Sequence, residues 1–326
     1  MSLKIGIVGL PNVGKSTLFN ALTNAKVLAA NYPFATIEPN SGMVAVPDER
    51  LVKLAEMYET EKIVPAQVEF VDIAGLVKGA SEGEGLGNQF LAHIRECHAI
   101  CHVVRAFEDP DVIATGTNPK EDIEIINLEL QLADDDTIAK MKAKKGFKES
   151  DLDEVPLLTR KPIIYMFNVD EKSLNDEARQ KDLAAIADSV TTGAQAIFVN
   201  ARIESELADL DAEMKTEFLA EYNIIHSGLE KLIRAAYDTL GLQSFLTAGK
   251  KEVRAWTVRK GATAPQAAGV IHTDFERGFI AASVAKYADL VELGSEKAVK
   301  EAGKLATVGK DYVMQPDDVV EFKFNV

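Results

Sequence analysis

The feature that most limits what this chain can fold into is an eight-residue stretch near its start. Gly9–Ser16 reads GLPNVGKS and matches the pattern G-x-x-x-x-G-K-[ST] in full. Glycines at this spacing let successive backbone N–H groups turn inward around phosphate oxygens, and the following helix adds the positive end of its dipole. Lys15 would reach the β- and γ-phosphates, and the Ser16 hydroxyl would ligate Mg²⁺. The stretch therefore predicts binding of a nucleoside triphosphate with magnesium.

The pattern around this loop predicts an α/β fold of the P-loop NTPase type, with a doubly wound, mostly parallel sheet. An apolar run precedes the loop, and a helical pattern follows it. Further short apolar runs alternate with helical patterns such as Leu86–Cys97, which is typical of a parallel sheet covered on both faces. Ligands of such sheets bind at the carboxyl ends of the strands. The predicted strands are Ile5–Val8, Val68–Ile73, Ile100–Phe107, Ile163–Val169 and Ala196–Asn200.

Two segments interrupt this alternation and set the expected domain boundaries. Residues 123–160 are polar, helix-prone and rich in lysine, and we expect them to form a helical projection inserted between two strands. A solvated surface helix and loop fits the same residues equally well. Residues 244–326 have a different order of strands and helices, which predicts a small α+β domain. The nucleotide-binding domain is then expected at 1–122 and 161–243.

A second motif predicts a switch that senses the γ-phosphate. Asp72 ends an apolar run and begins Asp-Ile-Ala-Gly, so it can hold Mg²⁺ through a water while the N–H of Gly75 contacts the γ-phosphate. Thr36 lies in the loop before the second strand, where its hydroxyl can ligate Mg²⁺ only when the γ-phosphate is bound. The glycine-rich stretch 78–88 follows directly, and we expect it to act as a mobile lid.

The residue after Gly75 bears on how fast the triphosphate is hydrolysed. Ras-type enzymes place a glutamine there to orient the attacking water, whereas this chain has Leu76. Hydrolysis must therefore be slow or use another group. Asn12 is one candidate, since it could support a monovalent cation such as K⁺ that acts like an arginine finger; an equal alternative is that it only shapes the loop. The candidate catalytic residues are Lys15, Asn12 and Gly75.

The end of the strand Ile163–Val169 bears on which base is bound. A guanine-specific site reads Asn-Lys-x-Asp, in which the carboxylate accepts two donors from guanine. Here Asn168 is followed by Val169, and Glu171 replaces the aspartate with a side chain one methylene longer. The longer carboxylate would crowd guanine, and the loss of paired hydrogen bonds removes strong discrimination. We expect relaxed or adenine-leaning specificity, with backbone N–H groups near Ala201 completing the base site.

Composition excludes several other classes of protein. The formal net charge of -15 argues against coating of bare nucleic acid, and we expect no sequence-specific DNA partner. No stretch of about eighteen apolar residues occurs, so we expect no membrane partner. The two cysteines fit a reducing compartment. Together these features predict a soluble protein of the cytoplasm.

These residues together resemble the YchF / Obg-like ATPase family, and the likeness covers nearly the whole chain. Leu76 fits a family that lacks the glutamine. The C-terminal stretch is similar to the family's TGS domain, which has a β-grasp-like fold. The stretches that carry the likeness are Gly9–Ser16, Asn31–Asn40 (NYPFATIEPN), Phe70–Gly87 (FVDIAGLVKGASEGEGLG), Asn168–Glu171 and Glu252–Phe279 (EVRAWTVRKGATAPQAAGVIHTDFERGF).

The resemblance implies an ATPase that prefers ATP over GTP, binds Mg²⁺, is stimulated by K⁺ and associates with the ribosome, where we expect the large subunit to be the partner. It implies that Ser16 and Thr36 ligate the metal. It also implies that Asn168 and Val169 contact the adenine. The residues that would hold the phosphates are Asn12, Val13, Gly14, Lys15, Ser16 and Thr17.

Two features differ from the family pattern. The helical hairpin expected before the strand at Ile163 is much shorter here, with only Ile138–Thr159 available for it. The loop at 111–116 lacks the histidine that relatives commonly carry there, so no catalytic base is assigned. Two alternatives therefore remain open: a GTPase of the same fold, and a ribosome-binding module that holds nucleotide with negligible turnover.

Overall fold

The structure, a computed structural model, describes residues 3–24, 40–73, 86–109, 118–222 and 224–325. These residues form two compact units. The first contains the described residues up to 44 and those from 68 to 240, and the second contains 45–67 and 241–325. Each unit has a six-stranded sheet. No helix in the described ranges is both long and apolar enough to cross a membrane.

The sheet of the first unit confirms the predicted strands. Its strands are β1 (Lys4–Val8), β2 (Ser41–Ala45), β4 (Gln67–Asp72), β5 (Ala99–Ala106), β6 (Ile163–Val169) and β7 (Gln195–Val199). They are ordered β2-β4-β1-β5-β6-β7, and every neighbouring pair from β4 to β7 is parallel. The carboxyl ends of these strands therefore meet at one edge, where ligands bind in sheets of this type.

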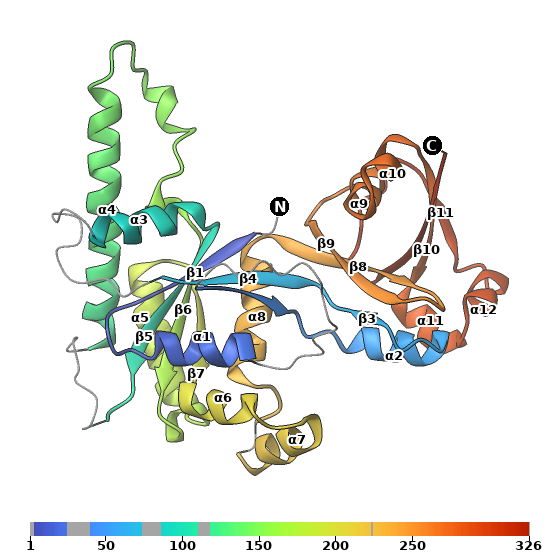
Figure 1. Ribbon diagram of the computed structural model, residues 1–326, viewed down its shortest axis with the longest axis horizontal. Coiled ribbons are helices and arrows are strands. Elements are labelled where there is room, and N and C mark those ends of the chain that lie inside the picture. Colours follow the sequence, from blue (N-terminus) through green and yellow to red (C-terminus); the bar gives the residue numbers. More distant parts are fainter. Residues whose placement is uncertain (1–2, 25–39, 74–85, 110–117, 223, 326) are drawn as a thin grey trace. The chain divides into compact units, whose positions relative to one another are not determined.

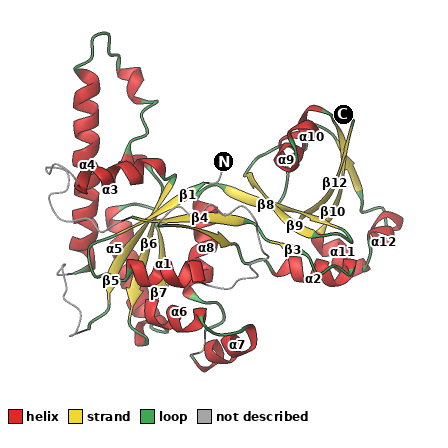
Figure 2. Ribbon diagram, in the orientation of Figure 1, coloured by secondary structure: helices red, strands yellow, loops and turns green. Residues whose placement is uncertain are grey.

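Helices cover both faces of this sheet (Figures 1 and 2). They are α1 (Lys15–Asn24), α3 (Leu86–Glu96), α4 (Pro119–Lys142), α5 (Glu177–Val190) and α8 (Gly228–Thr239). Two further helices, α6 (Ala201–Ala208) and α7 (Ala212–Glu221), follow β7. Along β6, Tyr165, Phe167 and Val169 point to the same face and pack with Ile123 of α4 and Leu183 of α5. This apolar cluster fixes one side of the sheet.

The predicted helical insertion is present, but it is rooted in the core of the unit. α4 begins four residues earlier than expected, at a helix cap in which the Asn118 side chain accepts from the N–H of Glu121 at 3.0 Å. One face of α4 is buried as far as Asp134, whose carboxylate accepts from the backbone of Leu158 and Thr159 at 2.9 Å each. Only the part beyond Asp134 extends away from the sheet, together with the chain that returns from it (Figure 1).

The second unit has a mixed sheet with small helices, as expected for the C-terminal residues. Its sheet order is β11-β10-β12-β8-β9-β3. The helix α9 (Ala264–Ile271) covers its core, in which Phe245, Ala268, Phe279 and Met314 are buried together. The remaining elements are α2 (Glu49–Tyr58), β3 (Ile63–Val64), β8 (Leu242–Ala248), β9 (Val253–Arg259), α10 (Thr273–Arg277), β10 (Phe279–Lys286), α11 (Tyr287–Leu293), α12 (Glu296–Glu301), β11 (Ala306–Val308) and β12 (Asp318–Phe324).

The domain boundaries differ from the expected ones in one respect. Residues 45–67 were expected in the nucleotide-binding domain, but they belong to the second unit. β3 extends the second sheet by pairing in parallel with β9, with Ile63 opposite Val253. Next to this pair the Lys62 ammonium lies 2.6 Å from the Glu252 carboxylate. The second unit is therefore built from two segments of the chain that are far apart in sequence.

Candidate nucleotide-binding site

The phosphate loop has a backbone that only its own residue types allow. A Cβ on Gly9 would stand 2.5 Å from the carbonyl oxygen of Val103, and a Cβ on Gly14 would stand 2.5 Å from Nδ2 of Asn168. Gly14 also has a φ of 101°, and Asn12 has a φ of 62°. Asparagine is among the few non-glycine residues that tolerate this left-handed region. The loop is thus held in a conformation that turns it tightly from β1 into α1.

The side chain of Lys15 points back over this loop. Its Nζ donates a 2.8 Å hydrogen bond to the carbonyl oxygen of Leu10, and only 8 % of the residue is exposed. Burial lowers the pKa of Lys15, and the nearby Asp72 carboxylate partly offsets this shift. Ser16 and Thr17 at the start of α1 are exposed. An ammonium and two hydroxyls therefore stand where the phosphate chain was expected.

Asp72 supplies the acidic partner of this loop. It ends β4 directly opposite Ile7 of β1, one residue before the strand leads into the loop. Burial raises the pKa of Asp72, and Lys15 partly offsets the shift. Its Oδ1 is buried and has no hydrogen-bond partner among the described residues. Mg²⁺ prefers such hard oxygen ligands, often through water, so Asp72 and the hydroxyl of Ser16 fit a magnesium site.

Asn168 connects the phosphate loop with the start of α6. Its Nδ2 donates to the carbonyl oxygen of Val13 at 3.0 Å, and its Oδ1 accepts from the N–H of Ala201 at 3.1 Å. Asn200 caps α6 with its Oδ1 and donates its Nδ2 to the carbonyl oxygen of Val169 at 2.9 Å. The two asparagines bring the ends of β6 and β7 together beside the loop.

A pocket of about 630 Å³ lies along these elements. This volume is within the usual range of small-ligand sites. The residues predicted from sequence that line it are Asn12, Gly14, Thr17, Asn168, Val169, Glu171 and Ala201. The structure thus brings together predicted residues from three separate parts of the chain. Thr36, Gly75, Leu76 and most of the expected lid lie outside the described residues.

The Val169 side chain does not lie where the lysine of a guanine-specific Asn-Lys-x-Asp site would cover the base. Its side chain is 1 % exposed and belongs to the apolar cluster with Phe167 and Leu183. It therefore meets the pocket through its main chain. Glu171 is exposed, one turn beyond the strand. Neither side chain forms the stacking stem of a guanine site.

The sequence analysis missed Phe107, which lines the same pocket from the end of β5. The Arg105 guanidinium lies 4.5 Å from the centre of the Phe107 ring. It also donates to the carbonyl oxygens of Phe107 at 3.3 Å and Asp109 at 3.4 Å. The signal was available, because Phe107 is an aromatic residue at the carboxyl end of the predicted strand Ile100–Phe107, and this end falls at the ligand edge of the sheet.

These features define a P-loop nucleoside triphosphatase domain of the GTPase fold, carried on a chain with a second, mixed-sheet unit. Each of these two parts of the chain matches a known protein family. Residues 4–169 match the family described as "50S ribosome-binding GTPase". Residues 242–325 match the YchF-GTPase C-terminal family, described as "Protein of unknown function (DUF933)".

Individual relatives cover the whole chain. The ribosome-binding ATPase YchF of Bacillus subtilis is 48 % identical over 366 residues, with 100 % of both chains covered. Obg-like ATPase 1 of Pongo abelii is 44 % identical and covers 99 % of this chain and 93 % of its own. The solved structure of the Schizosaccharomyces pombe YchF GTPase superposes with a TM-score of 0.85 at 37 % identity and covers 99 % of this chain and 98 % of its own. This chain belongs to the YchF / Obg-like ATPase family, which confirms the resemblance.

Proposed function

We propose that this protein binds and hydrolyses ATP and that its nucleotide state governs its association with the ribosome in the cytoplasm. The observation that carries the base assignment is the position of Val169. Its side chain is buried in the core, so the position that holds a lysine stem in guanine-specific sites contributes only main chain to the pocket. Phe107 supplies an aromatic surface instead, and an aromatic ring accepts adenine without selecting the guanine edge.

The proposed reaction is attack of water on the γ-phosphorus of ATP, which breaks its bond to the β–γ bridging oxygen and gives ADP and phosphate. Lys15 neutralises the charge that develops on the phosphate oxygens, and the loop N–H groups position the γ-phosphate. Ser16 and Asp72, with Thr36, would hold the Mg²⁺, which supplies further charge neutralisation when bound. Asn12 would support a K⁺ ion beside the same phosphates.

Ribosome association is supported by the relatives rather than by a site on this chain. The Bacillus subtilis relative is named a ribosome-binding ATPase, and the family matched by residues 4–169 is described as binding the 50S ribosome. The large subunit is therefore the proposed partner. Co-sedimentation with separated 30S and 50S subunits, with ATP and with ADP, tests this. If the same amount of protein sedimented with both subunits and with both nucleotides, the proposal would be contradicted.

Calorimetric titration with ATP and with GTP, each with Mg²⁺, tests the nucleotide. We expect tighter binding of ATP, loss of binding in Lys15→Ala, and phosphate release that is faster in KCl than in NaCl. Tighter binding of GTP would favour the alternative of a GTPase with the same fold. Phosphate release that is the same in Lys15→Ala as in the unchanged protein would favour a module that holds nucleotide without turning it over.

A further inference from the structure

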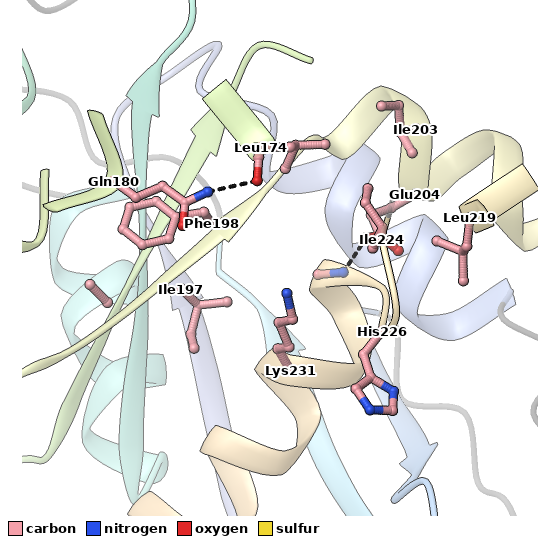
Figure 3. A pocket seen from close by; sticks show the side chains of 12 residues that line it. Leu174, Gln180, Ile197, Phe198, Ile203, Glu204, Leu219, Ile224, His226 and Lys231 are labelled. Carbon is pink, nitrogen blue, oxygen red and sulfur yellow. Dashed lines mark hydrogen bonds between the residues drawn. The ribbon is translucent and has the colours of Figure 1, made fainter. Parts of the chain in front are cut away.

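Glu204 is a buried carboxyl group close to the nucleotide pocket that the proposed function does not use. It lies on α6 and is 5 % exposed. Its Oε1 accepts from the N–H of Gly228, the first residue of α8, at 2.6 Å (Figure 3). An anion is stabilised at this end of a helix because the first N–H groups have no partner within the helix. Glu204 thus fastens α6 to α8.

The ionised form of this buried carboxyl group is not favourable for stability. Burial raises the pKa of Glu204 to about 7, although hydrogen bonds from the Gly228 and Leu229 N–H groups and from Ser227 act in the opposite direction. Loss of hydration therefore outweighs the stabilisation that the helix end provides. A neutral residue at this position would destabilise the folded protein less than the ionised carboxylate does. A residue that lowers stability is commonly kept because activity requires it.

The base site begins one helical turn before Glu204. Ala201, which donates its N–H to Asn168, is the first residue of α6, and Asn200 caps the helix. A continuous set of hydrogen bonds consequently runs from the start of α8 through α6 to Asn168 and on to the phosphate loop. Gly228 permits the close approach, since a Cβ there would stand 2.9 Å from Cγ2 of Val199 and 3.1 Å from Oε1 of Glu204.

We propose that Glu204 is a positioning residue for nucleotide binding: in its ionised form it clamps the start of α8 and so holds Asn200 and Ala201 in the geometry that receives the base. This rests on the proposed function of the pocket. A charge-assisted hydrogen bond is roughly twice as strong as a neutral one, so the clamp loosens when Glu204 is protonated. Affinity for a nucleotide then depends on the protonation of a group that never touches it.

A second cavity, of about 210 Å³, lies beside Glu204 and gives its carboxyl group room to exchange a proton (Figure 3). The titratable groups that face Glu204 come from α8 and the segment just before it: His226, Glu230 and Lys231. The walls from β7 and α7 are apolar, with Phe198 and Leu219 among them. Nδ1 of His226 lies 3.3 Å from the Glu230 carboxylate, so a substitution of His226 serves as a control.

The test compares ATP with inorganic tripolyphosphate, each with Mg²⁺, by calorimetry at pH 6.0 and pH 8.5. Tripolyphosphate occupies the phosphate loop but has no base. For Glu204→Gln we expect ATP binding about fivefold weaker than the unchanged protein at pH 8.5 and nearly equal to it at pH 6.0, since the neutral amide resembles the protonated acid. Using the ratio of the two proteins at each pH cancels the titration of the ligand. Tripolyphosphate should bind both proteins equally.

Two further variants make the result decisive. Gly228→Ala displaces α8 from Glu204 without changing any charge and should weaken ATP at pH 8.5 in the same way. His226→Asn should leave the pH dependence in place. If ATP binds normally to the unchanged protein and the ratio for Glu204→Gln stays at one at both pH values, Glu204 has no positioning role. Weaker tripolyphosphate binding in that variant would equally overturn the proposal. Absence of ATP binding in the unchanged protein would instead overturn the proposed function itself.

Discussion

The side-chain amide of Asn168 lies 3.0 Å from the carbonyl oxygen of Val13 and holds the phosphate loop against the end of β6. The other end of the same amide accepts from the N–H of Ala201. One residue therefore sets the distance between the part of the pocket that would hold phosphates and the part that would hold a base. Asn168 is only 6 % exposed, so water does not replace its hydrogen bonds to either partner when the side chain is removed.

Asn168→Ala should therefore affect stability as well as binding. It leaves a buried carbonyl and a buried N–H without partners, which costs roughly 2–4 kcal/mol of unfolding free energy. Urea unfolding measures this, and nucleotide titration should show at least a tenfold loss of affinity. Asn175→Ala is the matched control, because that asparagine is exposed and its side chain donates to the carbonyl of Tyr222. Equal stability of the two variants would contradict the bridging role.

Gly14→Ala should weaken ATP binding at the phosphate loop while leaving the fold largely intact. The added Cβ would meet Nδ2 of Asn168, and the φ of 101° disfavours any side chain. Strain of this kind costs about 1–3 kcal/mol, which corresponds to roughly 5- to 150-fold in ATP affinity if it falls on the bound loop. Gly249→Ala, where a Cβ meets nothing within 4 Å, is the control. Unchanged affinity in Gly14→Ala would show that the loop can move aside.

Arg105→Lys tests whether Phe107 must be held in place. Lysine keeps the charge but loses the planar group that stacks on the ring and donates to two carbonyl oxygens. We expect ATP affinity to fall by about threefold to tenfold while tripolyphosphate binding stays the same. The exposed Arg179 on α5 provides the control substitution to lysine. If the affinities for ATP and for tripolyphosphate fell together, Arg105 would act on the phosphate loop as a whole and not on the base site.

Glu204 also predicts how stability changes with pH. Because its pKa is raised in the folded protein from 4.5 to about 7, the folded state binds more protons than the unfolded state between these values. The contribution of this group is fully present below pH 4.5 and is lost as pH rises through 7, by up to roughly 3 kcal/mol. Glu204→Gln should therefore be more stable than the unchanged protein at pH 8 in urea unfolding. A variant that is less stable at pH 8 would refute this sign.

The sequence predicted those parts of the fold that are encoded locally. The spacing of Gly9, Gly14 and Lys15 defines the phosphate loop within eight residues, and the apolar runs place β1, β4, β5, β6 and β7 to within about two residues. Both patterns depend on near neighbours, so no knowledge of distant contacts is needed. Asp72 and Asn168 followed because each ends one of these strands.

The features that were not predicted depend on contacts between distant residues. β3 has only two residues, and nothing local indicates that Ile63 pairs with Val253. The buried face of α4 was not predicted because its polar residues include Asp134, whose hydrogen bonds to Leu158 and Thr159 join residues more than twenty positions apart. Glu204 reads as an ordinary surface position in a helix until the start of α8 is placed against it.

The pairing of β3 with β9 also has a consequence for biosynthesis. Ile63 is synthesised long before its partner Val253, which lies 190 positions further along the chain. At translation speeds of about 5–20 residues per second, roughly 10–40 s pass between the synthesis of β3 and that of its neighbour β9. During that interval the nascent chain exposes an unpaired strand, and the second sheet can form only after β9 has been synthesised.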